Sequence, residues 1–242
     1  MNILLNGSKG RMGQAITRHA LEYDVFIAAS LDRDDDALAA MPHCDVVVDF
    51  SFHTATVPLL ELAAEQGKPV VIGTTGHQAA EQAAIRTLSQ QIPVVWAGNY
   101  AIGVNLLFYL TEKAAAILHS DYHPEIVEMH HRMKQDAPSG TAMNLAEAIL
   151  RGRGWQQDAL TFGRQGITGE RPDQQVGIHA LRGGEIVGDH TVIFAGPGEC
   201  LKLQHTASDR RIFAQGALTA ARWVRNRPPG LYNMQDVIGL RD

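Results

Sequence analysis

The sequence predicts an α/β fold: a Rossmann-like, doubly wound parallel sheet, followed by a second α+β domain with a mixed or antiparallel sheet. Five short apolar runs recur in the first hundred residues, NILLN, VFIAASL, DVVVDF, PVVIG and IPVVWAG. Nearly continuous hydrophobicity of this kind is typical of strands that are buried on both faces. The stretches between the runs, such as MGQAITRHALEY and TVPLLELAAEQG, carry apolar residues at three- and four-residue spacing, which indicates helices.

The pattern changes after GNYAIGVN. A long helical segment, NLLFYLTEKAAAILHS, precedes strand-like runs that are separated by Gly-Gly and Gly-Pro-Gly turns, and these runs predict a meander of antiparallel or mixed strands. The helical stretch FAQGALTAARWVRN near the end is expected to pack back on the first domain. We therefore predict a dinucleotide-binding domain over residues 1–101 and 210–242, and a substrate-binding and oligomerisation domain over residues 102–209.

Composition narrows the function classes. The chain has 242 residues, 19% of them charged, and a formal net charge of -5 without any basic run, so a nucleic-acid-binding surface is not expected. No apolar run approaches the roughly 18 residues that cross a membrane. The two cysteines, Cys44 and Cys200, have no metal-like or redox spacing, and no metal site is expected. A soluble cytoplasmic protein is the resulting prediction.

The first loop carries a glycine pattern, LLNGSKGRMGQAI, between the first strand and the first helix. Gly7, Gly10 and Gly13 would let the backbone turn tightly and approach a pyrophosphate, which the N–H groups of the helix N-terminus would bind. Lys9 stands where a glycine is common, so the spacing is G-x-x-G-x-x-G. A glycine triplet alone is a weak signal, but this one has the strand and helix context that a dinucleotide site requires.

An acidic residue follows at the distance expected for ribose recognition. Asp32 closes VFIAASLD, and Arg33 comes next. A carboxylate there would accept hydrogen bonds from ribose hydroxyls, and a guanidinium could bind a 2′-phosphate. The pair predicts a site for both NADH and NADPH. The rest of DRDDD is interpreted as a solvated charged loop. All five predicted strands end in small, polar or charged residues, GSKG, DRD, SFH, GTTG and GNYA, as expected at a ligand-binding edge.

The stretch EIVEMHHRMKQDAPSGTAMNLAEAI, residues 125 to 149, concentrates acid–base and anion-binding groups. Its first part alternates like a strand that carries His130 and His131 near its end, Lys134 lies in the following loop, and Ser139 or Thr141 caps a helix. A helix N-terminus binds carboxylates as readily as phosphates. The arrangement predicts a site for a small anionic substrate beside an acid–base pair.

A structural reading competes with this one. One histidine could be structural and the lysine solvated, since adjacent histidines on a strand point to opposite faces. Glu125 and Glu128 are interpreted as structural or solvated. No role is assigned to five scattered histidines: His119, His123, His179, His190 and His205.

The stretch EIVEMHHRMKQDAPSGTA resembles the signature E-x-x-x-x-H-H-x-x-K-x-D-A-P-S-G-T-A of the 4-hydroxy-tetrahydrodipicolinate (dihydrodipicolinate) reductase family of lysine and diaminopimelate biosynthesis. The resemblance extends over GRMG, VVIGTTG, GNYAIGVNLL, GITGER, GGEIVGDHTVIF and GLYNMQDVIGL. It implies that 4-hydroxy-tetrahydrodipicolinate, a small dicarboxylate, is reduced to tetrahydrodipicolinate by NADPH or NADH. It also implies a homotetramer that assembles through the second sheet, with hinge closure between the domains.

The resemblance further implies residue roles. His130 matches the general acid–base, Lys134 a proton donor that also contacts substrate, and His131 a substrate contact. The carboxylate-binding turn corresponds to Ser139, Gly140 and Thr141. The implied cofactor-binding residues are Gly7, Ser8, Lys9, Gly10, Arg11, Met12, Asp32, Arg33, Gly73, Thr74, Thr75, Ala97, Gly98, Asn99 and Tyr100. Asp32 stands where a glutamate is common, and the segment after it is short.

Two alternatives remain open from the residues alone. A different two-domain nicotinamide enzyme, such as a small aldehyde or imine dehydrogenase, would share the first hundred residues but not the second-domain signature. A non-catalytic NAD(P)-binding sensor would need the glycine loop but not His130 together with Lys134.

Overall fold

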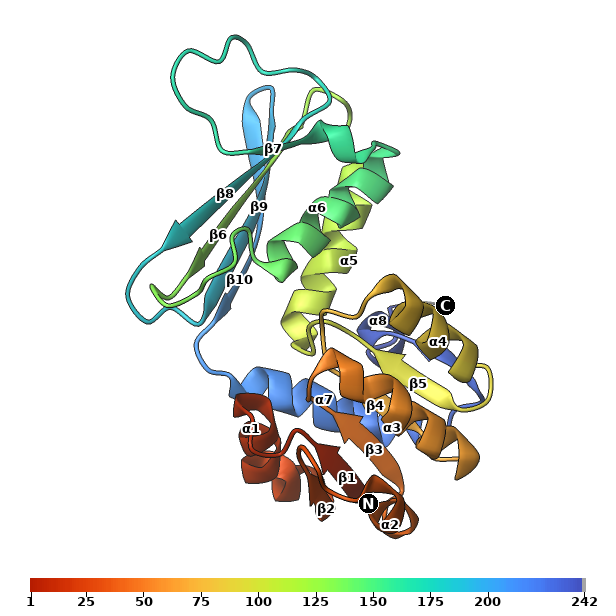
Figure 1. Cartoon of the computed structure of the whole chain (residues 1–242). Helices are drawn as coiled ribbons and strands as arrows, with labels where there is room; N and C mark the ends of the chain where they lie inside the picture. The colour runs from red at the N-terminus through yellow and green to blue at the C-terminus, as the bar shows by residue number, and fades with distance from the viewer. Residues whose placement is uncertain (241–242) are drawn as a thin grey trace. The chain divides into compact units, whose positions relative to one another are not determined.

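The computed structural model describes residues 1–240, and its chain folds into two compact units (Figure 1). The first unit comprises Met1–Ile102 and the segment that begins at Arg210, and the second comprises Gly103–Asp209. Each unit has its own sheet, so each is described separately. No helix within residues 1–240 is long and apolar enough to cross a membrane.

Within the described residues, the sheet of the first unit has six strands, all parallel, in the order β11-β5-β4-β3-β1-β2. The strands are β1 (Asn2–Asn6), β2 (Phe26–Leu31), β3 (Val46–Asp49), β4 (Val70–Ile72), β5 (Pro93–Trp96) and β11 (Gly230–Tyr232). The predicted Rossmann-like sheet is confirmed. Strand β11 was not predicted, because its three residues begin at the glycine of a Pro-Pro-Gly turn and show no strand periodicity. The expectation that VFIAASL is buried on both faces is wrong, because β2 lies at the sheet edge and is half-exposed.

Helices cover both faces of this sheet (Figure 1). Alternate residues of β1 divide between two cores: Ile3 and Leu5 pack with α7, and Leu4 packs with α3. The predicted return of the C-terminal helix is confirmed by that packing. The helices of this unit are α1 (Arg11–His19), η1 (Ala20–Tyr23), α2 (Ala37–Ala40), η2 (Met41–His43), α3 (His53–Glu65), α4 (Ala79–Leu88), α7 (Arg211–Val224) and α8 (Met234–Val237).

The strand order reverses direction between β1 and β3. From β1 the chain crosses to β2 on one side, and from β3 it continues to β4 and β5 on the other. Asn6 and Asp49 are paired in register at the carboxyl ends of these two strands. Ligands of open parallel sheets bind at such a switch point, beyond the strand ends.

The second unit has a mixed sheet in the order β10-β9-β6-β8-β7. Strand β9 runs antiparallel to β6 and β10, whereas β6, β8 and β7 are parallel. Its elements are β6 (His123–His130), α6 (Gly140–Arg153), η3 (Gln157–Ala159), β7 (Leu160–Phe162), β8 (Val176–Arg182), β9 (Gly188–Gly196) and β10 (Glu199–Ala207), preceded by α5 (Ile102–Ile117).

The mixed sheet was predicted, but the meander was wrong. Strands β9 and β10 form a hairpin through the Gly-Pro-Gly turn, whereas β6 lies between β8 and β9. The β8–β9 connection passes the end of β6, where Gly183 N donates to His130 O and His131 N donates to Ile186 O. Sequence periodicity reports strands but not this long-range pairing.

Strand β6 alternates strictly between half-buried and buried residues. Its buried face carries Ile126, Glu128 and His130 and packs against α6, which also contacts β8 and β9. The opposite face carries Glu125, and the strand therefore separates two environments.

Candidate active site

The glycine loop after β1 is built as a dinucleotide loop requires. Gly7 has a φ of +81°, which favours glycine, and a Cβ there would lie 2.2 Å from the carbonyl oxygen of Phe50. A Cβ at Gly13 would lie 2.3 Å from the carbonyl oxygen of Gly7, so glycine also lets α1 approach the loop closely. Gly10 is the N-cap of α1 and provides no side-chain acceptor to its first turn. The N-terminal N–H groups of α1 are thus suited to an anion.

Asp32 and the glycine loop are joined by hydrogen bonds. Ser8 Oγ donates to Asp32 Oδ2 at 2.7 Å, Lys9 N donates to Oδ1 at 3.2 Å, and Lys9 Nζ lies 3.8 Å from Oδ2. The hydrogen bond from Ser8 lowers the pKa of Asp32. The carboxylate is therefore ionised at neutral pH and accepts only. Arg33 is exposed beside it.

A pocket of about 640 Å³ opens at this loop. Four predicted cofactor residues line it: Gly7, Gly10, Asp32 and Arg33. Phe50, Ser51 and Phe52, which follow β3, line it as well and were not predicted. The sequence signal for Ser51 and Phe52 is the SFH segment after the third predicted strand.

The remaining predicted cofactor residues lie at the carboxyl ends of strands or at the start of α1. Gly73, Thr74 and Thr75 follow β4, and a second group follows β5: Ala97, Gly98, Asn99 and Tyr100. Arg11 and Met12 begin α1. The side chain of Tyr100 is buried in the core, where its hydroxyl donates to Ile72 O at 2.8 Å. The ring of Tyr100 thus packs in the core, and its hydroxyl group binds the backbone of β4.

Asp49, at the end of β3, organises the loops around the switch point. Its carboxylate is fully buried and accepts hydrogen bonds from four neutral side chains. The donors are Asn6 Nδ2 at 2.9 Å, Ser51 Oγ at 2.5 Å, Thr56 Oγ1 at 2.7 Å and Thr74 Oγ1 at 2.9 Å. These donors come from the ends of β1, β3 and β4 and from α3. A buried carboxylate requires such partners, and they tie the loops together.

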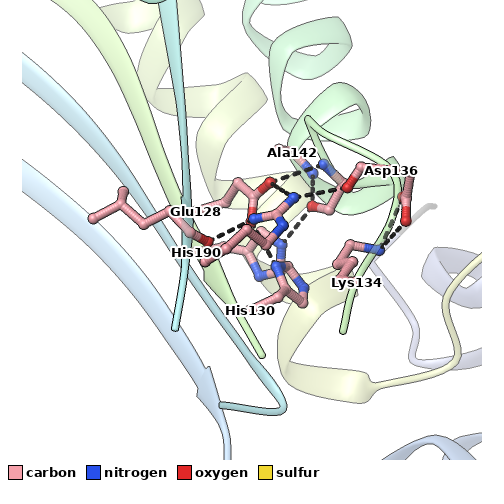
Figure 2. Close-up of polar contacts among 9 residues, drawn as sticks. Glu128, His130, Lys134, Asp136, Ala142 and His190 are labelled. Carbon is pink, nitrogen blue, oxygen red and sulfur yellow. Dashed lines mark hydrogen bonds and ion pairs between the residues drawn. The ribbon is translucent and has the colours of Figure 1, made fainter. Parts of the chain in front are cut away.

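In the second unit, a buried cluster surrounds the end of β6 (Figure 2). Glu128 is fully buried, and its Oε2 lies 2.5 Å from His130 Nδ1. Arg182 binds the same carboxylate with both Nη atoms, at 2.8 Å each. Ser139 N donates to Glu128 Oε1 at 3.0 Å. The interpretation of Glu128 as solvated is wrong, because its side chain is fully buried.

The pKa shifts follow from burial and from these contacts. Burial lowers the pKa of His130, and the positive charges of Lys134 and Arg182 lower it further, against the effect of Glu128. Burial raises the pKa of Glu128, but the hydrogen bonds from Arg182 and His130 outweigh it, so the pKa is lowered. Glu128 is therefore an anion at neutral pH, and His130 titrates below its usual range.

Lys134 and Ser139 lie in the loop and at the helix start that the sequence predicted. Lys134 Nζ donates to the carboxylate of Asp136 (Figure 2), at 2.8 Å to Oδ1 and 2.9 Å to Oδ2. Ser139 is the N-cap of α6, because its Oγ accepts from Ala142 N at 3.1 Å. Gly140 and Thr141 form the first turn, which contains no acidic residue. His131 lies just past β6 and is half-buried.

His190 belongs to the same cluster, although no role was assigned to it. Its Nε2 lies 2.9 Å from Ser139 Oγ, and its ring stands edge-on to that of His130 with centroids 5.0 Å apart. Burial lowers its pKa to about 4, so it is neutral at physiological pH. The sequence did not reveal it, because His190 lies opposite Glu128 only when β9 pairs with β6 in this antiparallel register.

These features fit a nicotinamide dinucleotide in the first unit: a cradle that a Cβ would fill, an uncapped helix N-terminus and an ionised acid. Among residues 1–240, no group of three or more His, Cys, Asp or Glu side chains could hold a metal ion.

Comparison with known proteins gives the family. Residues 1–100 match the family described as "Dihydrodipicolinate reductase, N-terminus", and residues 103–238 match the corresponding C-terminus family. A 4-hydroxy-tetrahydrodipicolinate reductase of Akkermansia muciniphila is 50% identical over 99% of this chain and 98% of its own length. One from Thiobacillus denitrificans is 44% identical over 100% of this chain and 99% of its own.

The fold has a similar solved structure. Dipicolinate-bound dihydrodipicolinate reductase from Paenisporosarcina sp. TG-14 matches with a TM-score of 0.78 and 24% identity, over 98% of this chain and 99% of that one. The resemblance drawn from the sequence motifs is confirmed by the two family matches and by the curated relatives. The chain belongs to the dihydrodipicolinate reductase family, a family of nicotinamide-dependent oxidoreductases.

Proposed function

We propose that this chain reduces 4-hydroxy-tetrahydrodipicolinate to tetrahydrodipicolinate, with NADPH or NADH, in lysine and diaminopimelate biosynthesis. The observation that carries the proposal is the buried Glu128–His130 pair beside Lys134 and the N-terminus of α6. The names of the curated relatives supply the substrate. In the balanced reaction, substrate, NAD(P)H and a proton give tetrahydrodipicolinate, NAD(P)⁺ and water.

The first unit would hold the cofactor. The Gly7–Gly13 loop and the N-terminus of α1 would bind the pyrophosphate, and Asp32 the ribose hydroxyls. Arg33 would contact a 2′-phosphate when NADPH is bound. The residues after β4 and β5, from Gly73 and from Ala97, would lie toward the nicotinamide. When bound, the cofactor supplies the hydride.

The second unit would bind the dicarboxylate and provide the proton. The N–H groups of Gly140 and Thr141, with Lys134 and His131, would bind carboxylates. Loss of the 4-hydroxyl as water would leave a ring with conjugated C=C and C=N bonds. Hydride addition to that ring would build negative charge toward the ring nitrogen, and His130 and Lys134 would supply the proton that neutralises it. A dianionic substrate also favours the charged imidazolium, so it would offset the lowered pKa of His130.

The direct test is oxidation of NADPH or NADH, followed at 340 nm, with freshly generated 4-hydroxy-tetrahydrodipicolinate. Turnover that depends on both substrates supports the proposal. Absence of turnover with either cofactor, in protein that binds NADPH, contradicts the substrate assignment. A Lys134→Ala variant should lose most of kcat while it still binds NADPH, and unchanged kcat would remove Lys134 from the mechanism.

The cofactor assignment has its own test. Arg33→Ala should raise the KM for NADPH by about tenfold, roughly the value of one exposed charge-assisted contact, and change the KM for NADH little. Arg18→Ala, on the exposed side of α1 and outside the pocket lining, is the matched control. Equal effects of Arg33→Ala on both cofactors would show that Arg33 does not contact the 2′-phosphate.

We also propose a homotetramer assembled through the second sheet. Strand β10 lies at the sheet edge, and most of its residues are exposed, which supports an interface there. Light scattering on the eluted protein should give four times 26.4 kDa, and a monomeric mass would contradict the proposal.

A further inference from the structure

Glu128 is completely buried, unlike the carboxylate of a surface ion pair. Its side chain has no exposed area, and its oxygens accept from Arg182, from Ser139 N and from His130. Burying a carboxylate is costly unless donors replace the lost water. The protein has therefore placed a fixed negative charge directly behind one nitrogen of His130.

That placement selects the histidine tautomer. An ionised carboxylate only accepts hydrogen bonds, so the Nδ1 atom that lies 2.5 Å from Oε2 must carry the proton. In the neutral ring the other nitrogen, Nε2, is then the free base. Among residues 1–240, no group hydrogen-bonds Nε2, and the residue beside it is Gly188, where a Cβ would lie 3.1 Å away. Nε2 is thus the atom left for an external proton donor or acceptor.

We propose that Glu128 is a positioning residue for the reaction: it keeps the His130 proton on Nδ1, orients the ring, and so makes Nε2 the atom that exchanges a proton with the substrate. Arg182 positions Glu128 in turn. This inference rests on the proposed function only in assuming that His130 transfers the proton. The tautomer itself is a property of the protein alone.

The imidazolium form is also stabilised by the same carboxylate. The charged or titratable groups around His130 are Glu128 on its own strand, Lys134 in the following loop, Arg182 on β8 and His190 on β9. Of these, Glu128 alone raises the pKa of His130, whereas burial, Lys134 and Arg182 lower it. Without the Glu128 charge, the proton would be held more weakly, and the pKa of His130 would fall further.

Strand β6 provides a matched control. Glu125 also binds a histidine, His179 Nε2 at 2.9 Å, and an arginine, Arg164, at 2.8 and 3.0 Å, but on the opposite face. We expect Glu128→Gln to lower kcat by about 10- to 100-fold, the range seen when the partner behind a metal-binding histidine is lost. The KM for substrate should change less. Glu125→Gln makes the same chemical change on the same strand and should leave kcat unchanged.

A readout besides turnover decides whether Glu128 positions His130 or only supports the fold. Side-chain ¹⁵N resonances of His130, assigned by comparison with His130→Gln, report the protonated nitrogen and the pKa. In the wild type, Nδ1 should carry the proton above the pKa. In Glu128→Gln, the pKa should be lower and Nε2–H should become populated, while Glu125→Gln should match the wild type.

The outcomes separate the two claims. A wild-type Nε2–H tautomer, or an unchanged tautomer and pKa in Glu128→Gln, would overturn the positioning role whatever the turnover. If Glu128→Gln does not fold, the tautomer of His130 in the wild type still tests the positioning role. Conversely, normal turnover of His130→Gln, with the Nδ1–H tautomer observed in the wild type, would sink the proton-transfer proposal and leave the tautomer assignment standing.

Discussion

A glutamate of strand β6 meets a histidine and at least one arginine on each face of the strand, yet the two clusters differ in which histidine nitrogen stays available. On one face Glu125 binds His179, Arg164 and Arg171, and on the other Glu128 binds His130 and Arg182. Helix α6 packs against the Glu128 side, where the Glu128 side chain has no exposed area, whereas the Glu125 side chain keeps an exposure of 20%.

The difference lies in which histidine nitrogen is used. His179 binds Glu125 through Nε2, its distal atom, whereas His130 binds Glu128 through Nδ1 and leaves Nε2 available. A carboxylate, a histidine and an arginine are therefore not sufficient to indicate a catalytic site. Burial of the carboxylate and the nitrogen that remains available distinguish the two clusters.

The largest effect should separate the two histidines. We expect His130→Gln to lower kcat by about 10²- to 10⁴-fold, the usual contribution of general acid–base catalysis. His179→Gln should stay within about twofold of the wild type, because its ring nitrogen serves an ion-pair cluster on the other face. Steady-state assays at saturating NADPH measure both. A large loss of kcat in His179→Gln would mean that the Glu125 cluster also contributes to turnover.

A smaller effect should appear in the pH dependence of the free energy of unfolding, through His190 on the Glu128 side of β6. Burial lowers the pKa of His190 to about 4, against 6.5 in the unfolded chain. Between these values the unfolded chain holds a proton that the folded chain lacks, so acidification from pH 6.5 to 4 favours unfolding. Each pKa unit corresponds to about 1.4 kcal/mol, which gives about 3 kcal/mol in total.

The measurement is the urea-unfolding midpoint as a function of pH. In His190→Gln, the midpoint should fall less between pH 6.5 and 4 than in the wild type, and the two curves should run parallel below pH 4. An identical fall in both proteins would show that His190 is not the buried neutral group described here.

The Glu125 cluster should change the free energy of unfolding by a smaller amount and at lower pH. Burial raises the pKa of Glu125, but hydrogen bonds from Arg164, His179 and Arg171 prevail and lower it to about 2, against 4.5 unfolded. Its stabilisation is present above pH 4.5 and is lost as the pH falls to 2. Partial exposure and screening reduce it to about 1–2 kcal/mol.

Glu125→Gln should therefore lower the unfolding midpoint at pH 7 and flatten its dependence between pH 4.5 and 2. Glu128→Gln should also flatten the dependence below pH 4.5, because the pKa of Glu128 is lowered as well. If the Glu125→Gln midpoint equals that of the wild type at pH 7, the ion pairs of Glu125 contribute nothing measurable to stability.

The sequence predicted what is local and missed what pairing brings together. Gly7, Asp32 and the Ser139 cap could be predicted because their spacing in the chain is itself the motif. Glu128 could have been found as well, since it precedes His130 by two residues and thus shares its face. Arg182 and His190 could not, because they reach the cluster only through the registers of β8 and β9.

Asp49 shows the same limit in the first unit. A single acid at a strand end looks like many polar loop residues, and its four donors come from separate segments. Strand β11 is a third case, because three residues form a strand only when β5 is available to pair with them.

Arg182 has a consequence for how this region can change over evolutionary time. Its guanidinium binds Glu128, and Nη2 also donates to the carbonyl oxygen of Asp136, the residue whose carboxylate holds Lys134. Losing Arg182 would free the buried acid and the lysine-bearing loop together. Substitutions at positions 128, 134 and 182 should therefore show strong epistasis, and the three residues are expected to be exchanged, if at all, as a set.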